Sequence, residues 1–251
     1  MTRSTFVYIS MLTMLTASSA LAQEAAGQQD TTASTTAADS MLIDPNASQV
    51  PMVPEDQLYS GWRAKTLIDQ EVYGPNGNDL GEIHDMIVGP DGKVSAIVVE
   101  GGGFLEIGDA MFRISWDQVK ARTGGDGVMV PLTEETAENF GLYDSGDFVR
   151  EGPQEFRLSE LLGDRVVLNN GVSYGYVNDV VIGQDGKLLS VIVNNAAAPY
   201  GAYAYPWYGY NYGWNPGLAY YALPVTEVNP AAGVVKVDPG RFGQVPFAAA
   251  Q

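Results

Sequence analysis

The sequence contains no cysteine and a single histidine, His84, in 251 residues. Without cysteine the chain can form no disulfide, no thiol nucleophile and no thiolate metal site. One imidazole is also too few for histidine-rich metal centres, and it leaves only one histidine that could act as a general base. The composition therefore argues against most metalloenzyme classes and against mechanisms that need more than one histidine.

Basic residues are scarce as well. The chain has 13 Lys and Arg against 30 Asp and Glu, which gives a formal net charge of −17. A nucleic-acid-binding protein needs a basic surface that neutralises phosphates, and anionic lipid surfaces attract basic segments. We therefore expect no nucleic-acid partner and no electrostatic attachment to lipid. A chain this acidic could instead attract cationic partners.

The N-terminal apolar run, residues 6–17, is too short to be a good membrane span. It follows Arg3 and precedes Ala-Leu-Ala at 20–22, which is the pattern of a signal peptide with its cleavage site. An uncleaved anchor helix is the alternative. We predict that residues 1–22 are a signal peptide cleaved after Ala22, so that the mature protein is periplasmic or secreted and not integral to a membrane.

Two other segments have little apolar material to bury. Residues 23–56 consist largely of Ala, Thr, Ser, Gln and Pro. Such a composition cannot offset the entropy lost on ordering, so we predict a disordered linker there. We assign residues 243–251 to a C-terminal tail.

One segment occurs twice. Residues 72–99 (VYGPNGNDLGEIHDMIVGPDGKVSAIVV) align without a gap with residues 166–193 (VVLNNGVSYGYVNDVVIGQDGKLLSVIV). The two copies share glycines, Asp-Gly turns and alternating apolar positions, which specify a β fold. We predict an all-β protein with two tandem small β-barrel domains, at 57–150 and 151–242.

We predict that the repeated polar residues and glycines are structural. The Asp-Gly pairs at 91–92 and 185–186 indicate tight hairpins. Asp85 and Asp179 lie among aliphatic strand residues, where a carboxylate must be hydrogen-bonded, and we expect backbone N–H donors from a neighbouring turn or bulge. A metal or acid–base role is the alternative, but no second repeated carboxylate or histidine accompanies them. The structural set is Gly81, Asp85, Asp91, Gly92, Gly175, Asp179, Asp185 and Gly186.

One uncharged segment, residues 199–221, holds eight Tyr and two Trp. We interpret it as an insertion that replaces the loop at Gly101–Gly103, with the repeat resuming where 223–228 matches 114–119. An exposed aromatic patch marks a binding surface for sugars or for another protein. The alternative is a low-complexity loop that covers its own barrel or stays mobile. The candidate binding residues are Tyr203, Tyr205, Trp207, Tyr208, Tyr210, Tyr212 and Trp214.

The order of these motifs resembles the PRC-barrel family. The second copy departs from the family pattern because it lacks the Gly-Gly-Phe-Leu-x-Ile-Gly motif. The resemblance implies a small β-barrel that binds other proteins, and it implies no chemistry. The matching positions are Gly81, Asp85, 91–93 and 102–108 in the first copy, and Gly175, Asp179, 185–187 and Pro224 in the second.

The sequence thus predicts a non-enzymatic periplasmic module that binds a protein partner or acts as a scaffold in the cell envelope, with a role in assembling or stabilising a membrane complex. The alternative is a binder of glycans or small ligands that uses the aromatic insertion. A hydrolase is disfavoured because His84 and Asp85 lie on opposite faces of one strand. We predict no catalytic residue, metal or cofactor, and leave the partner's identity and the oligomeric state open.

Overall fold

The computed structural model describes residues 53–102, 109–122, 127–133, 135–136, 141–143, 154–195, 200–209, 214, 217–226 and 234–242. All of them belong to one compact unit, Leu42–Gln251, and a second unit comprises Met1–Met41. The predicted signal peptide, most of the predicted linker and the predicted tail 243–251 lie outside the described residues.

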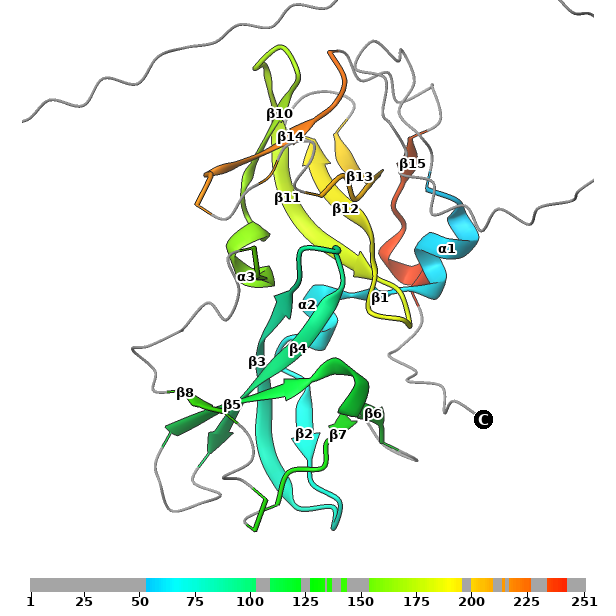
Figure 1. Ribbon diagram of the computed structural model, residues 1–251. Coiled ribbons are helices and arrows are strands. Elements are labelled where there is room, and N and C mark those ends of the chain that lie inside the picture. The colour runs from blue at the N-terminus through cyan, green and yellow to red at the C-terminus, as the bar shows by residue number, and fades with distance from the viewer. Residues whose placement is uncertain are drawn as a thin grey trace, which may run out of the picture. The chain divides into compact units, whose positions relative to one another are not determined.

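The first copy forms one sheet in which most neighbouring strands are antiparallel (Figure 1). The strand order is β6-β7-β2-β3-β4-β5-β8, and β2 and β7 run parallel. The strands are β2 (Glu71–Tyr73), β3 (Asp79–Val88), β4 (Val94–Gly102), β5 (Asp109–Ser115), β6 (Lys120–Ala121), β7 (Val128–Met129) and β8 (Gly141–Tyr143).

The second copy repeats this arrangement (Figure 1). The strand order is β14-β10-β11-β12-β13-β15, with β10 and β14 parallel as β2 and β7 are in the first copy. The all-β prediction and the prediction of two tandem copies are confirmed. The strands are β10 (Arg165–Leu168), β11 (Ser173–Ile182), β12 (Leu188–Asn195), β13 (Gly201–Pro206), β14 (Tyr220–Leu223) and β15 (Val235–Lys236).

The described helices are short. None of them is long and apolar enough to cross a membrane. The first begins at Glu55, so the last residues of the predicted linker 23–56 are helical rather than disordered. The helices are α1 (Glu55–Ser60), α2 (Ala64–Leu67), α3 (Leu158–Leu161) and the 3-10 turns η1 (Trp116–Gln118) and η4 (Pro239–Arg241).

The two copies exchange their first strands. β1 (Trp62–Arg63), which leads into the first copy, pairs with β11 of the second copy. β9 (Phe156–Arg157), which leads into the second copy, pairs with β3 of the first copy. The predicted boundaries at 57–150 and 151–242 therefore cut through shared structure, because each sheet is completed by a strand from the other segment.

A single apolar core results from this exchange. One cluster of buried side chains includes Ile97 and Val99 of β4 together with Val191 and Val193 of β12. A second, smaller cluster forms where Leu58 of α1 packs on the second sheet. Since the larger cluster contains residues of both copies, the copies fold as one unit and not as separate barrels.

The interpretation of residues 199–221 as an insertion is wrong. Pro206 of β13 pairs with Ser190 as Ser115 of β5 pairs with Ala96, and Ser190 aligns with Ala96 in the repeat. β13 is therefore the second copy's β5, and Trp207 is the counterpart of Trp116. The resumption of the repeat at 223–228 was also misplaced, because Tyr221 of β14 occupies the position of Val128 of β7.

Gly81 and Gly175 occupy equivalent places in the two sheets. Each lies where the pairing register with the preceding strand shifts. A Cβ atom at Gly81 would stand 1.9 Å from the carbonyl oxygen of Glu100, and one at Gly175 would stand 2.0 Å from that of Asn194. Only glycine allows the neighbouring strand to approach this closely.

Candidate functional site

Asp85 anchors the second copy's leading segment to the first sheet. Its Oδ1 accepts hydrogen bonds from the backbone N–H of Met86 at 2.8 Å and of Ser159 at 3.1 Å. Its Oδ2 accepts a hydrogen bond from the Ser159 hydroxyl. The side chain is only 1% exposed, so this carboxylate is buried and occupied by donors from both copies.

Asp179, in the second sheet, anchors the first copy's leading segment in the same way. Its Oδ1 accepts from the backbone N–H of Val180 at 2.9 Å and of Lys65 at 3.1 Å. Its Oδ2 lies 2.8 Å from Nε and 2.7 Å from a terminal nitrogen of Arg63, which is a forked, charge-assisted contact. Asp179 is fully buried.

The prediction that neighbouring backbone groups satisfy both carboxylates is confirmed, and the donors from the other copy were missed. Each aspartate follows a β-bulge, between Ile83 and Asp85 and between Val177 and Asp179. The bulge interrupts the strict alternation of faces. Its extra residue turns both carboxylates toward the exchanged segments.

The two Asp-Gly hairpins contact each other. The backbone N–H of Val94 donates to the carbonyl of Gly186, and that of Leu188 donates to the carbonyl of Gly92, both at 2.9 Å. Lys93 and Lys187 form an antiparallel bridge between them. These turns therefore join the copies as well as closing the hairpins.

The turn residues adopt the predicted conformation. Gly92 and Gly186 have φ angles of 72° and 80°. Asp91 and Asp185 each accept a hydrogen bond at 3.1 Å from the backbone N–H two residues later, which is an Asx turn.

A tryptophan from the opposite copy covers each of these glycines. A Cβ at Gly92 would stand 2.8 Å from Nε1 of Trp207, and one at Gly186 would stand 2.9 Å from Nε1 of Trp116. Trp207 also stacks on Phe156 and Tyr221 with centroid separations of 6.0 and 5.8 Å. Trp207 therefore packs between the copies, at a position that sequence reasoning assigned to a binding surface.

The expectation of an exposed aromatic surface is wrong for the described members. Tyr203 is 4% exposed, Tyr205 is 0%, Tyr208 is 9% and Trp214 is 1%. All four belong to the core, and Tyr203 and Tyr205 are there because they are inward residues of the sheet strand β13. Tyr210 and Tyr212 lie outside the described residues, so their role in binding stays a prediction.

Two polar contacts within this aromatic core are specific. The hydroxyls of Tyr174 and Tyr205 lie 2.5 Å apart, and burial raises the pKa of both. The indole Nε1 of Trp214 donates to Oδ2 of Asp164 at 2.6 Å. Burial nevertheless raises the pKa of the Asp164 carboxyl, and the Trp214 bond opposes that shift.

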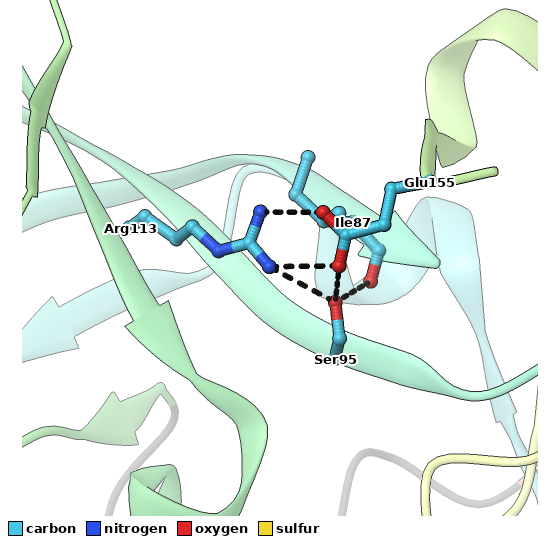
Figure 2. Close-up of polar contacts among 4 residues, drawn as sticks. All are labelled: Ile87, Ser95, Arg113 and Glu155. Carbon is cyan, nitrogen blue, oxygen red and sulfur yellow. Dashed lines mark hydrogen bonds and ion pairs between the residues drawn. The ribbon is translucent and has the colours of Figure 1, made fainter. Parts of the chain in front are cut away.

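A further ionic contact fixes the segment before β9 on the first sheet (Figure 2). The guanidinium of Arg113 donates to both Glu155 oxygens at 2.9 and 3.1 Å. Ser95 Oγ lies 3.2 Å from Glu155 and also contacts the carbonyl of Ile87. The hydrogen bonds from Arg113 lower the pKa of Glu155. No sequence signal singled out this pair, because neither residue has a charged counterpart in the other copy.

The outward faces of the two sheets differ. Glu71, Glu82 and Glu100 lie directly opposite one another on β2, β3 and β4, and we refer to them as the acidic row. His84 Nδ1 lies 3.0 Å from Glu100, at the surface. The equivalent positions of the second copy, extended to β14, hold Tyr220, Arg165, Tyr176 and Asn194, which we refer to as the donor row.

The remaining candidates for chemistry are the acidic side chains and the cavity beside the β2–β3 turn. Among the described residues, no group of three His, Asp or Glu side chains could hold a metal ion. Among the described residues that line the cavity beside the β2–β3 turn, Glu135 is the one ionisable side chain. The cavity is lined by Gly74, Pro75, Asn76, Asn78, Leu80, Leu132, Thr133 and Glu135.

The sequence profile of the PRC-barrel domain matches the chain twice, over residues 62–137 and 153–243. The chain belongs to the PRC-barrel family. Each match begins at or just before an exchanged strand, β1 in the first copy and β9 in the second. No curated protein matches the chain. The family assignment therefore establishes the fold and both copies, and leaves the function to the arrangement of side chains.

Proposed function

We propose that this PRC-barrel protein is a non-enzymatic, periplasmic protein-interaction module of the cell envelope, exported by a signal peptide that is cleaved after Ala22. One observation carries the proposal. The repeated carboxylates Asp85 and Asp179, the best candidates for chemistry, are buried and saturated with hydrogen-bond donors from the two copies. They hold the molecule together, which is the role expected of a scaffold.

The reciprocal joint also favours a rigid scaffold. Both sheets share one apolar core and exchange one strand in each direction. A rigid pair of sheets presents its outward side chains in fixed positions, which lowers the entropic cost of binding a partner. A role in assembling or stabilising a membrane complex is consistent with such a module.

The glycan-binding alternative loses its main support, because the described aromatics of 199–221 are largely buried. Tyr200, at 73% exposed, is the exception among the described tyrosines of that segment. We therefore favour a protein partner.

Site-specific photocrosslinking in the native host tests the proposal. A photoreactive amino acid is placed at Val172, Tyr200 or Leu218, each of which is exposed. We expect a discrete protein adduct in the periplasmic fraction and a mature N-terminus at Gln23. A chain that stays in the cytoplasm, or that gives no discrete adduct at any of the three positions, would contradict the proposal.

A further inference from the structure

Arg165, at the start of β10, differs from the other described arginines. It is exposed, and no hydrogen bond, ion pair or ring contact links its side chain to any described residue. Each of the others has a partner within the chain. Arg63, Arg113, Arg157 and Arg241 contact carboxylates, and Arg122 lies over the ring of Tyr73.

This isolation is notable in so acidic a chain. With a formal net charge of −17, the protein has many carboxylates that could neutralise an arginine. The aligned position of the first copy holds Glu71, which lies opposite Glu82. The second copy therefore presents a guanidinium with free hydrogen-bonding capacity where the first presents carboxylates.

The rest of the donor row surrounds Arg165 with uncharged donors. Tyr220 on β14 and Tyr176 on β11 lie directly opposite Arg165, and Asn194 on β12 lies opposite Tyr176. Tyr176 is 54% exposed, Asn194 is exposed, and Tyr220 is half-buried. None of these three side chains hydrogen-bonds to a described residue. With neighbouring strands about 4.8 Å apart, the row extends for roughly 14 Å.

The chemistry of the donor row fits carboxylates. A guanidinium binds a carboxylate through two parallel N–H donors, and tyrosine hydroxyls and an asparagine amide can donate to further oxygens. Tyrosine and arginine are also the residues that most often dominate the binding energy of protein interfaces. We propose that the donor row binds an Asp- or Glu-bearing segment of a protein partner. The proposal rests on the interaction function argued above.

The position of the row favours a protein over a small acidic ligand. Its members share one outward sheet face across four adjacent strands. Small molecules bind in concave sites, whereas protein partners cover open faces of this kind.

A peptide-binding measurement tests the proposal with the full mature chain. The probe is a fluorescein-labelled peptide of alternating Glu and Gly, and the neutral comparison is the same peptide with Gln in place of Glu. By fluorescence anisotropy at low salt, we expect the Glu peptide to bind and the Gln peptide not to bind. Binding should weaken as salt is added, because the contact is ionic and exposed.

Matched variants distinguish the contribution of the donor row to binding from the effect of the protein's overall charge. Arg165→Glu should weaken binding of the Glu peptide more than tenfold, and Tyr176→Ala by about three- to tenfold. Lys120→Glu is the control, because it makes the same charge change at an exposed position of the first copy. It should leave the affinity within about twofold. Unchanged thermal melting of all three variants shows that they remain folded.

Three results would overturn the proposal. The first is no binding of the Glu peptide by the unaltered chain, and the second is an equal loss for Arg165→Glu and Lys120→Glu. The third is tighter binding of oligogalacturonate, an acidic saccharide, than of the Glu peptide. If Arg165→Glu still forms the photocrosslinked adduct in cells, the interaction function stands and the donor row is not its site.

Discussion

The two copies hold their exchanged strands with the same backbone contacts but with different side-chain chemistry. In each, a buried aspartate accepts the N–H of the residue after it and an N–H of the other copy's leading segment. Asp179 also pairs with Arg63, whereas Asp85 takes the Ser159 hydroxyl, and Arg157 contacts Glu160 instead. In both copies the aspartate accepts N–H hydrogen bonds, and Asp179 adds an ion pair, the one with Arg63.

The outward faces diverge further. Where the first copy has Ser95 and Arg113 bound to Glu155, the second has Leu189 and Ala204 packed beneath α1. Gly61 stands at the position of Glu155, with a hypothetical Cβ 2.5 Å from Val181. The same junction is thus ionic in one copy and apolar in the other. Inward positions are constrained by the shared core, and outward positions are free to acquire different partners.

Replacing the two aspartates should cause the largest losses of stability, and the two losses should differ. Asp179→Leu leaves Arg63 and two N–H groups without their acceptor, so we expect a loss of about 3–5 kcal/mol in the free energy of unfolding. Asp85→Leu orphans donors but no cation, and should cost about 2–3 kcal/mol. Urea unfolding followed by tryptophan fluorescence measures both. Equal losses would mean that the Arg63 ion pair adds nothing.

Replacing the bulge glycines Gly81 and Gly175 should cause the next largest losses of stability. A methyl group at Gly81 or Gly175 would collide with the neighbouring strand, and Gly81 also has a φ of 123°. We expect Gly81→Ala to cost about 3 kcal/mol and Gly175→Ala about 2 kcal/mol. Gly77→Ala is the control, because it has a positive φ but no atom within 4 Å, and should cost about 1 kcal/mol. If Gly81→Ala and Gly77→Ala cost the same and Gly175→Ala, which has no positive φ, costs nothing, the positive φ matters and the close strand approach does not.

The sequence predicted each sheet well, because Asp-Gly turns and bulge glycines act through local geometry. It could not predict which sheet Trp62-Arg63 joins, since pairing with either copy satisfies the same local pattern. The aromatic segment was misread for a related reason. Matching Pro224 to the family's proline displaced the alignment, whereas Pro206 occupies the position of Ser115. A run of tyrosines has the same composition whether it forms a core strand or a surface loop.

The Glu155 contact predicts an acid-sensitive junction in the first copy. Arg113 lowers the pKa of Glu155, so its stabilising contribution is present above the unfolded-state pKa and is lost as the pH falls through the folded-state pKa. Glu155→Gln should cost on the order of 1 kcal/mol at neutral pH and nothing in acid. Unfolding free energies at neutral pH and in acid measure this difference. A loss that is independent of pH would show that shape matters here and charge does not.

Asp164 should give the smallest effect, with the opposite sign. Burial raises the pKa of its carboxyl, so the folded state binds the proton more tightly than the unfolded state does. The stability from this group is then present below the unfolded-state pKa and is lost as the pH rises through the folded-state pKa. At neutral pH the ionised Asp164 therefore lowers the stability of the folded protein slightly.

The first copy indicates how to avoid this destabilisation, because the uncharged Gln70 occupies the position of Asp164. The backbone N–H of each residue donates to the carbonyl three residues earlier. Asp164→Asn keeps an acceptor for Trp214 but carries no charge. We expect it to raise the free energy of unfolding at neutral pH by about 0.5 kcal/mol or less, and to be neutral or slightly destabilising in acid. Thermal melting across this pH range, with Asp164→Ala as the variant that loses the Trp214 bond, measures the difference. If Asp164→Asn destabilises the protein at neutral pH, the charged hydrogen bond to Trp214 outweighs the cost of burying the carboxylate. Asp164 would then stabilise the second copy, where the first copy has Gln70.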